Sequence, residues 1–440
     1  MQAYFYALGD FINAQIHAYE TTLAYLSAEE SNFVRFNKNT VRQAGTIKQL
    51  MLTLSLIAHQ RRAESRISLA GVRDHDQALI IATLETLRRD LGDLAEDPYL
   101  LFNQAAQSSE HFGESTLPSD AEILDQVMSQ GGARDLVGLF ASGTIYKGFA
   151  NSLGQRNWHR VDNFNFEWCL YHAADKAVKN GYAGTHWNRT AFGEKMAASN
   201  ERLDILKRPP KALPPGQYRA YLAPAAVNEI VSLLSWGSFG VKSQRNKQSP
   251  LMKLEDGTMA LNSSISLREN SLDGVAPGFQ ADGFLKTPEV ALITGGRHAG
   301  ALVSPRSARE FGIENNGANA AEAPEALDMA AGTLQPEAVL NTLDTGLLIG
   351  NLHYLNYSDR ATCRMTGMTR FATFWVENGE IQAPLNVMRF DDSAYRLLGD
   401  NLLGLTAERD WILDSASYGE RSTASVRLPG ALVKDFVLTL

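Results

Sequence analysis

Apolar side chains near the start of the chain follow two different spacings. The first is helical, with apolar residues three or four positions apart. This stripe comprises Phe5, Leu8, Ile12, Ile16 and Tyr19. From Asn32 to Asn37 the spacing becomes the alternation of a strand, with Val34 and Phe36 on one side and Arg35 on the other. The pattern therefore predicts a first helix followed by a strand.

Three further segments continue the strand pattern after a turn at Asn37-Lys38-Asn39. They are Val41–Gln49, Leu50–Ala58 and Arg66–Ala70. In the second of these, Leu52, Leu54 and Leu56 occupy one face. Short alternating runs joined by turns are typical of an antiparallel meander, which we expect here.

Helical and strand patterns then alternate up to residue 206. We expect helices over Asp74–Leu91, Ala121–Met128 and Glu194–Leu206, and strands over Leu136–Phe149 and Phe164–Tyr171. Asp74 is the expected N-cap of the first of these helices, and Pro118-Ser119-Asp120 is the start signal of the second. The first half of the chain is therefore predicted to be an α/β domain with an antiparallel sheet.

Two proline pairs divide the chain near its middle. Pro209-Pro210 and Pro214-Pro215 lie too close together to belong to a helix or a central strand. A chain of 440 residues is also long for a single compact core. We predict two domains, residues 1–208 and 209–440.

The second half has one clear helix and many short strands. Pro224–Trp236 is the helix, and Pro224 suits its first turn. The expected strands are Val290–Thr294, Gly346–Leu355, Phe371–Val376, Glu380–Leu385 and a last strand from Ala424. Asn378-Gly379 lies between two alternating runs, which is a strong hairpin signal. We also expect a helix over Ala394–Leu405 and an exposed connection over Ala318–Ala331. The predicted fold class is α+β, with a mainly β, barrel-like second domain.

Composition narrows the classes of function. A net charge of -8 argues against a broad nucleic-acid-binding surface. The basic cluster of Lys242, Arg245, Lys247 and Lys253 is interpreted as a solvated loop rather than a binding patch. Only 2 cysteines occur, which excludes a disulfide framework and fits a reducing compartment. No apolar stretch is long enough to span a bilayer, so we expect a cytoplasmic protein without membrane contacts.

The common catalytic motifs are missing from the chain. No phosphate-binding loop or Gly-x-Ser-x-Gly elbow occurs, and none of the 9 histidines is followed directly by Glu, so every zinc-peptidase motif that begins with His-Glu is absent. Cys169, His172 and Asp175 could share one side of a helix and bind a metal. The alternation before them favours a strand instead, which would separate Cys169 from His172. Asp391-Asp392 is interpreted as a helix cap.

Several segments, in the same order, resemble the TldD/PmbA family and in particular its TldE/PmbA-like subunits. The most distinctive is Thr366–Ile381, followed by Pro384. The others are Asp344–Ile349, Tyr354-Leu355-Asn356, Ser307-Ala308-Arg309 and Ala150–Gly154. The resemblance implies an α/β N-terminal domain and a largely β C-terminal domain.

The resemblance also implies where a zinc site would be. TldD-type subunits carry a His-Glu-x-x-x-His motif on the helix that opens the second domain, and a Cys near the C-terminus. The matching positions here are Asn228, Glu229 and Leu233, and no Cys lies near Ser417–Glu420. A catalytic zinc needs three protein donors, and Asn and Leu do not supply them. We therefore expect no zinc in this chain, and we interpret Glu229 as an exposed helical glutamate.

The family precedent is a heterodimer, so we expect a non-catalytic subunit whose TldD-like partner holds the zinc. The expected substrates are unfolded or modified peptides, captured by addition to an exposed sheet edge. One alternative is a stand-alone hydrolase that uses His353, Cys363 and Asp359, with Arg364 lowering the pKa of the thiol. Another is a protein-binding modulator without catalysis. A homodimer in the absence of the partner remains open.

Overall fold

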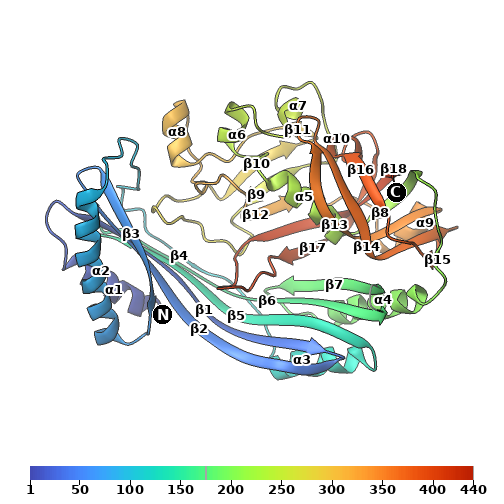
Figure 1. The fold of residues 1–440 in the computed structure, drawn as a ribbon, viewed down its shortest axis with the longest axis horizontal. Helices are drawn as coiled ribbons and strands as arrows, with labels where there is room; N and C mark the ends of the chain where they lie inside the picture. The colour runs from blue at the N-terminus through green and yellow to red at the C-terminus, as the bar shows by residue number, and fades with distance from the viewer. Residues whose placement is uncertain (174–175, 440) are drawn as a thin grey trace.

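The computed structural model describes residues 1–173 and 176–439 and contains two sheets (Figure 1). Within these residues the first sheet has seven strands in the order β3-β2-β1-β5-β6-β4, with β7 also paired to β6. Its elements are α1 (Gln2–Asn13), β1 (Thr21–Asn37), β2 (Thr40–Ala58), β3 (Arg61–Leu69), α2 (Arg73–Asp93), β4 (Ser109–Phe112), α3 (Asp120–Gly131), β5 (Asp135–Asn151), β6 (Arg156–Ala173), β7 (Lys176–Gly184) and α4 (Arg189–Leu206).

The predicted antiparallel meander is confirmed with one difference: Val41–Gln49 and Leu50–Ala58, predicted as separate segments, form the single strand β2. β1 pairs with β2 and β2 pairs with β3, both antiparallel. Leu52, Leu54 and Leu56 are fully buried in one cluster with apolar residues of α1 and α2. At the other end of the sheet, Val34 and Phe36 pack in a cluster that includes residues of α3 and α4. Two helix pairs therefore cover different ends of one sheet face.

Some local predictions for this half are wrong. The helical stripe ends early, because α1 stops at Asn13 and leaves Ile16 and Tyr19 outside it. Asp74 does not cap α2; instead the carboxylate of Asp76 accepts hydrogen bonds from the backbone N–H groups of Ala70 and Gly71. By contrast, the start signal of α3 is confirmed, since Ser119 forms a complete capping box there.

The second sheet has eleven strands within the described residues, and part of it closes on itself. Its elements are β8 (Gly216–Leu222), α5 (Pro224–Ser235), α6 (Val241–Arg245), α7 (Met252–Glu255), β9 (Leu267–Asn270), β10 (Glu289–Thr294), β11 (Arg297–His298), α8 (Pro305–Phe311), β12 (Ala326–Met329), a 3-10 turn (Pro336–Ala338), α9 (Val339–Leu343), β13 (Gly346–Asp359), β14 (Arg364–Glu377), β15 (Glu380–Pro384), β16 (Arg389–Ser393), α10 (Ala394–Leu397), β17 (Leu402–Leu413) and β18 (Ser425–Leu438). The order β18-β16-β14-β13-β8 ends with β8 paired back to β18. This closure confirms a mainly β, barrel-like C-terminal half.

Two predictions for this half are wrong and one is confirmed. The helix expected over Ala394–Leu405 is only the four residues of α10, since the chain turns at Gly399 and continues as strand β17. The connection expected to be exposed contains β12, whose four residues are all buried. The Asn-Gly hairpin is confirmed: Asn378 and Gly379 both have positive φ between β14 and β15.

The chain crosses from the first sheet to the second between α4 and β8. The domain boundary at residue 208 lies in this connection and remains a prediction. Side chains also join the two halves directly. Lys195 of α4 pairs with Asp410 of β17 at 2.8 Å, and the buried guanidinium of Arg421 donates to the backbone oxygen of Asn163 at 3.1 Å. Among the described residues, no helix combines the length and apolar character that a bilayer crossing requires.

Candidate functional site

A narrow cleft separates the first sheet from helix α5 and strand β17. It encloses a cavity of about 90 Å³. Its polar lining comes from Asn165, Glu167, Lys179 and Asn180 on β6 and β7, and from Asn228, Glu229, Asn351 and Asp410 in the second half of the chain. The helix that the resemblance singles out therefore borders the space between the two halves.

The spacing of apolar residues along α5 decides which of its side chains reach this cleft. Pro224 occupies the first turn, and the apolar face packs into the C-terminal core through Val227, Ile230, Val231 and Leu234. Asn228 and Glu229 are half-buried and line the cavity. Leu233 is 7% exposed and belongs to the core cluster. The three positions of the zinc motif are therefore divided between cleft and core.

Glu229 is not the exposed helical glutamate that we expected from the sequence. It is half-buried, and burial raises the pKa of its carboxyl, while Lys179 opposes the rise and Glu167 adds to it. Lys179 lies 3.7 Å from Glu167 on the neighbouring strand. The expectation failed because β6 and β7, far away in the sequence, lie against this part of α5.

The donors around α5 do not fit a zinc ion. Asn228 and Leu233 supply no usable ligand, and Asp410 is engaged by the ammonium group of Lys195. Nowhere among residues 1–173 and 176–439 do three His, Cys, Asp or Glu side chains come together in a metal-binding group. A catalytic zinc requires three such donors, so we derive no chemistry through a metal in this chain.

The segment Ser417–Glu420, where the family's Cys is expected, lies beside this cleft. Ser417 lines a neighbouring cavity that shares Asn165, Glu167 and Leu413 with the first one. Glu420 accepts a hydrogen bond from Ser27 of β1 at 2.5 Å and pairs with Arg66 of β3 at 3.3 Å. These contacts fasten the C-terminal segment to the first sheet. Two regions that the resemblance links, α5 and this segment, are therefore close in space.

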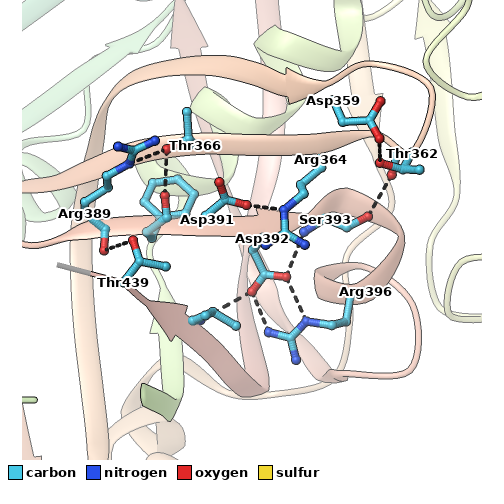
Figure 2. A network of polar contacts seen from close by, with 12 residues as sticks. Asp359, Thr362, Arg364, Thr366, Arg389, Asp391, Asp392, Ser393, Arg396 and Thr439 are labelled. Atoms are coloured by element: carbon cyan, nitrogen blue, oxygen red, sulfur yellow. Dashed lines mark hydrogen bonds and ion pairs between the residues drawn. The ribbon is translucent and has the colours of Figure 1, made fainter. Parts of the chain in front are cut away.

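The residues of the alternative hydrolase site are not assembled. Cys363 is fully buried in the C-terminal core, where burial raises the pKa of its thiol to about 12. Arg364 pairs with Asp391, and the carboxylate of Asp359 accepts a hydrogen bond from Thr362 at 2.6 Å (Figure 2). His353 is half-buried on β13 opposite Met368. Since a nucleophilic cysteine needs a lowered pKa and an adjacent base, this set lacks the required arrangement.

The acidic pair Asp391-Asp392 is not a helix cap, because both residues lie within strand β16. The buried carboxylate of Asp392 accepts two hydrogen bonds from Arg396 of α10, at 2.8 and 2.5 Å (Figure 2). It also accepts one from the backbone N–H of Val437 on β18 at 3.3 Å. This aspartate therefore joins three elements of the barrel.

The structure also places two of the three candidate metal ligands near residue 170. Cys169 and His172 both lie in strand β6 and not on a helix, and the pairing with β7 shifts register at His172. Asp175 lies outside the described residues. The strand interpretation is therefore confirmed over the metal interpretation for the first two residues.

Comparisons with solved structures found proteins that share the fold over almost the whole chain. The structure is similar to that of TldE from Thermococcus kodakarensis, at 12% identity and a TM-score of 0.77, over 99% of this chain and 100% of that one. It is similar to a putative modulator of a DNA gyrase from Thermotoga maritima, at 15% identity and a TM-score of 0.75, over 99% and 100% of the chains. A putative modulator of DNA gyrase from Bacteroides thetaiotaomicron matches at 12% identity and a TM-score of 0.71, over 99% and 98%.

These identities are low and establish the fold alone. No curated protein matches the chain. A family model described as the PmbA/TldA metallopeptidase C-terminal domain matches residues 215–439, which is more than half of the sequence. On this match and the fold, the chain belongs to the TldD/PmbA family.

Proposed function

We propose that this chain is a TldE/PmbA-like, non-catalytic subunit of a heterodimeric zinc metallopeptidase. In this arrangement a TldD-like partner holds the zinc and performs hydrolysis. Membership of the family supports a role in such an assembly, and the shared fold with a TldE supports the choice of subunit. The substrates are unfolded or modified peptides, in line with the family resemblance.

The observation that carries the proposal is the environment of α5. A glutamate beside zinc acts as a general base only when three other protein donors fix the metal and its water. Here Glu229 has Asn228 beside it, and Leu233 is buried among apolar side chains. A single substitution would not restore the site, because a histidine at residue 233 would have to leave the core to reach the cleft.

The rest of the proposal follows from the chemistry of the chain. We place the protein in the cytoplasm, which is consistent with its two free cysteines, Cys169 and Cys363. Its net charge of -8 favours protein and peptide partners over nucleic acid. Peptides would be recognised mainly through their backbones, which tolerates varied sequences.

Metal analysis and a peptidase assay on the chain alone and with a TldD-like partner test this function. The chain alone should contain less than about 0.1 zinc per molecule and cleave no unfolded casein, since it lacks three donors. The co-purified complex should contain about one zinc and cleave casein. Zinc bound in stoichiometric amounts by the chain alone, together with cleavage, would overturn the proposal.

A pair of variants separates the roles of the two subunits. Replacement of the glutamate in the partner's His-Glu-x-x-x-His motif should abolish cleavage, because that residue polarises the zinc-bound water. The Glu229→Gln change in this chain should leave cleavage by the complex within about twofold, since Glu229 polarises no water. A loss of activity in Glu229→Gln comparable to that of the partner's variant would assign catalysis to this chain.

A further inference from the structure

Half of strand β2 forms an unpaired edge of the first sheet. Strand β3 pairs only with Leu50–Ala58, whereas Thr40–Gln49 is paired with β1 alone. Figure 1 shows β2 as the outer strand where the sheet extends away from α1 and α2. In an antiparallel ladder every second residue directs its N–H and C=O away from its partner. The ladder is interrupted by a bulge at Arg42, since Val41 pairs with Phe36 and Gln43 with Arg35. From Gln43 to Gln49 the edge therefore presents a regular row of free backbone donors and acceptors.

The same segment is bare on both faces. Every side chain from Thr40 to Lys48 is exposed, and Gln49 is half-buried. Val41 and Ile47 are 40% and 43% exposed. The segment contains no proline, and Gly45 has open space around the position of a Cβ. Proteins usually protect a long edge with a proline, charged side chains, a bulge or a covering element. Arg42, which is charged and bulged, and Lys48 supply such protection near the two ends of this edge, but Gln43–Ile47 between them has none of it.

The charges beside this edge are positive. Arg35, Lys38 and Arg42 are exposed, and no described carboxylate lies within ion-pair distance of them. Lys48 is neutralised by Glu30 at 2.7 Å. Pairing two copies of this edge would bring these cations together, which is unfavourable. A strand that carries acidic side chains would be attracted instead.

We propose that Thr40–Gln49 is the docking edge for an extended acidic segment of the TldD-like partner subunit. This occupant rests on the heterodimer of the proposed function. A short peptide would satisfy the backbone edge but leave both faces of β2 bare. A folded partner can add a strand to the edge and also cover Val41 and Ile47, which combines an apolar centre with a polar rim.

Two adjacent proline substitutions test the backbone part of the proposal. Of Ala44→Pro and Gly45→Pro, one removes an N–H that points outward and the other removes an N–H bonded to β1. The outward variant should keep the melting temperature of the isolated chain but bind the partner about tenfold more weakly or worse, because an added strand loses its hydrogen bond and meets the proline ring. Thermal unfolding of the isolated chains identifies which variant is which, and surface plasmon resonance measures binding.

A charge variant tests the choice of an acidic occupant. Arg35→Glu combined with Arg42→Glu should weaken binding about tenfold or more and reduce its dependence on salt. The matched control is Arg245→Glu combined with Lys247→Glu, which reverses two exposed cations outside the first sheet and should leave binding unchanged.

Each outcome decides between named alternatives. If the wild-type chain binds the TldD-like partner and the stable proline variant binds equally well, the edge inference is wrong and the heterodimer stands. If the wild-type chain forms no complex, both proposals fail. If the proline variant loses self-association while the complex stays intact, the edge binds a second copy of the chain. If it loses binding of an acidic peptide while the complex stays intact, the edge binds substrate. Either result would overturn the partner assignment.

Discussion

The two halves of strand β2 share one partner strand but have opposite environments. Leu50–Ala58 lies between β1 and β3, and its leucines pack against α1 and α2. On the other face, Ile57 packs with Phe279 of the C-terminal half. Thr40–Gln49 also pairs with β1, yet every residue from Thr40 to Lys48 is exposed, and only Gln49 at its end contacts the C-terminal segment, through Gly419. A continuous ladder therefore connects a buried strand to a bare one.

This contrast shows that a segment can keep its strand conformation while contributing little to the stability of the sheet. Backbone pairing with β1 is enough to keep Thr40–Gln49 extended, but hydrogen bonds contribute little net free energy compared with burial of apolar surface. Stability of the first sheet should therefore come from the half that contains Leu52, Leu54 and Leu56. The bare half is free to change its contacts when a partner binds.

Hydrogen exchange should show the largest difference between the two halves. The amides of Leu50–Ala58 are enclosed between two strands and should exchange only on global unfolding. The outward amides of Thr40–Gln49 should exchange more than about a thousandfold faster in the isolated chain. Exchange measured by mass spectrometry on overlapping peptides checks this, and binding of the partner should protect the second segment. Equal protection in the isolated chain would mean that the edge is already covered.

Truncation of one apolar side chain in each half sharpens the comparison. Leu54→Ala should lower the free energy of unfolding by about 3 kcal/mol, because it leaves a cavity in the core beneath α1 and α2. Ile47→Ala should change it by less than about 0.5 kcal/mol, since that side chain is exposed. Urea denaturation of both variants gives the two values. Similar losses would show that the bare half is packed in solution.

Ion pairs in the two regions should differ in the same way. Glu20 is buried just before β1 and binds Arg88 of α2 at 2.9 Å, whereas Glu30 and Lys48 form an exposed pair on the bare half. Arg88→Met should cost about 2 kcal/mol, because it leaves a buried carboxylate without its cation. Lys48→Met should cost less than about 0.5 kcal/mol. Urea denaturation near neutral pH compares the two variants.

The Glu20 pair also predicts a pH dependence. Burial alone would raise the pKa of Glu20, but hydrogen bonds from Arg88 and from the backbone of His17 outweigh it and lower the pKa. The stabilisation is therefore present above the ordinary value of 4.5 and is lost as pH falls through the lowered pKa. In the Arg88→Met variant the free energy of unfolding should depend less on pH in this acid range. A dependence on pH equal to that of the wild type would contradict a stabilising pair between Glu20 and Arg88.

Local signals in the sequence predicted much of the fold. The alternation of Leu52, Leu54 and Leu56, the capping box at Ser119 and the Asn378-Gly379 turn each depend on neighbours within a few residues. The late helix at Ala394–Leu405 failed because its leucines fit a strand as well as a helix, and pairing of β17 with β18 decides between them.

The site was less predictable, since its properties depend on distant segments. The resemblance located Asn228, Glu229 and Leu233, but not the burial of Glu229 against β6 and β7. The bare edge of β2 was missed for a related reason. No residue in Thr40–Gln49 marks this segment as unpaired. It is unpaired because β3 is only nine residues long and does not reach it.

Glu229 gives a smaller expected effect than the Leu54 and Arg88 substitutions, and its sign is opposite to that of Glu20. Burial raises the pKa of Glu229, so the folded state holds this proton more tightly than the unfolded state does. Stability should therefore fall as pH rises from the ordinary value of 4.5 through the raised pKa. Glu229→Gln removes this penalty and should be more stable than the wild type by up to about 1 kcal/mol near pH 7.5, with no difference near pH 4. Urea denaturation at both pH values tests this. A variant that is less stable near pH 7.5 would mean that the carboxylate has a stabilising partner in the cleft, and that Glu229 resembles the paired Glu20 after all.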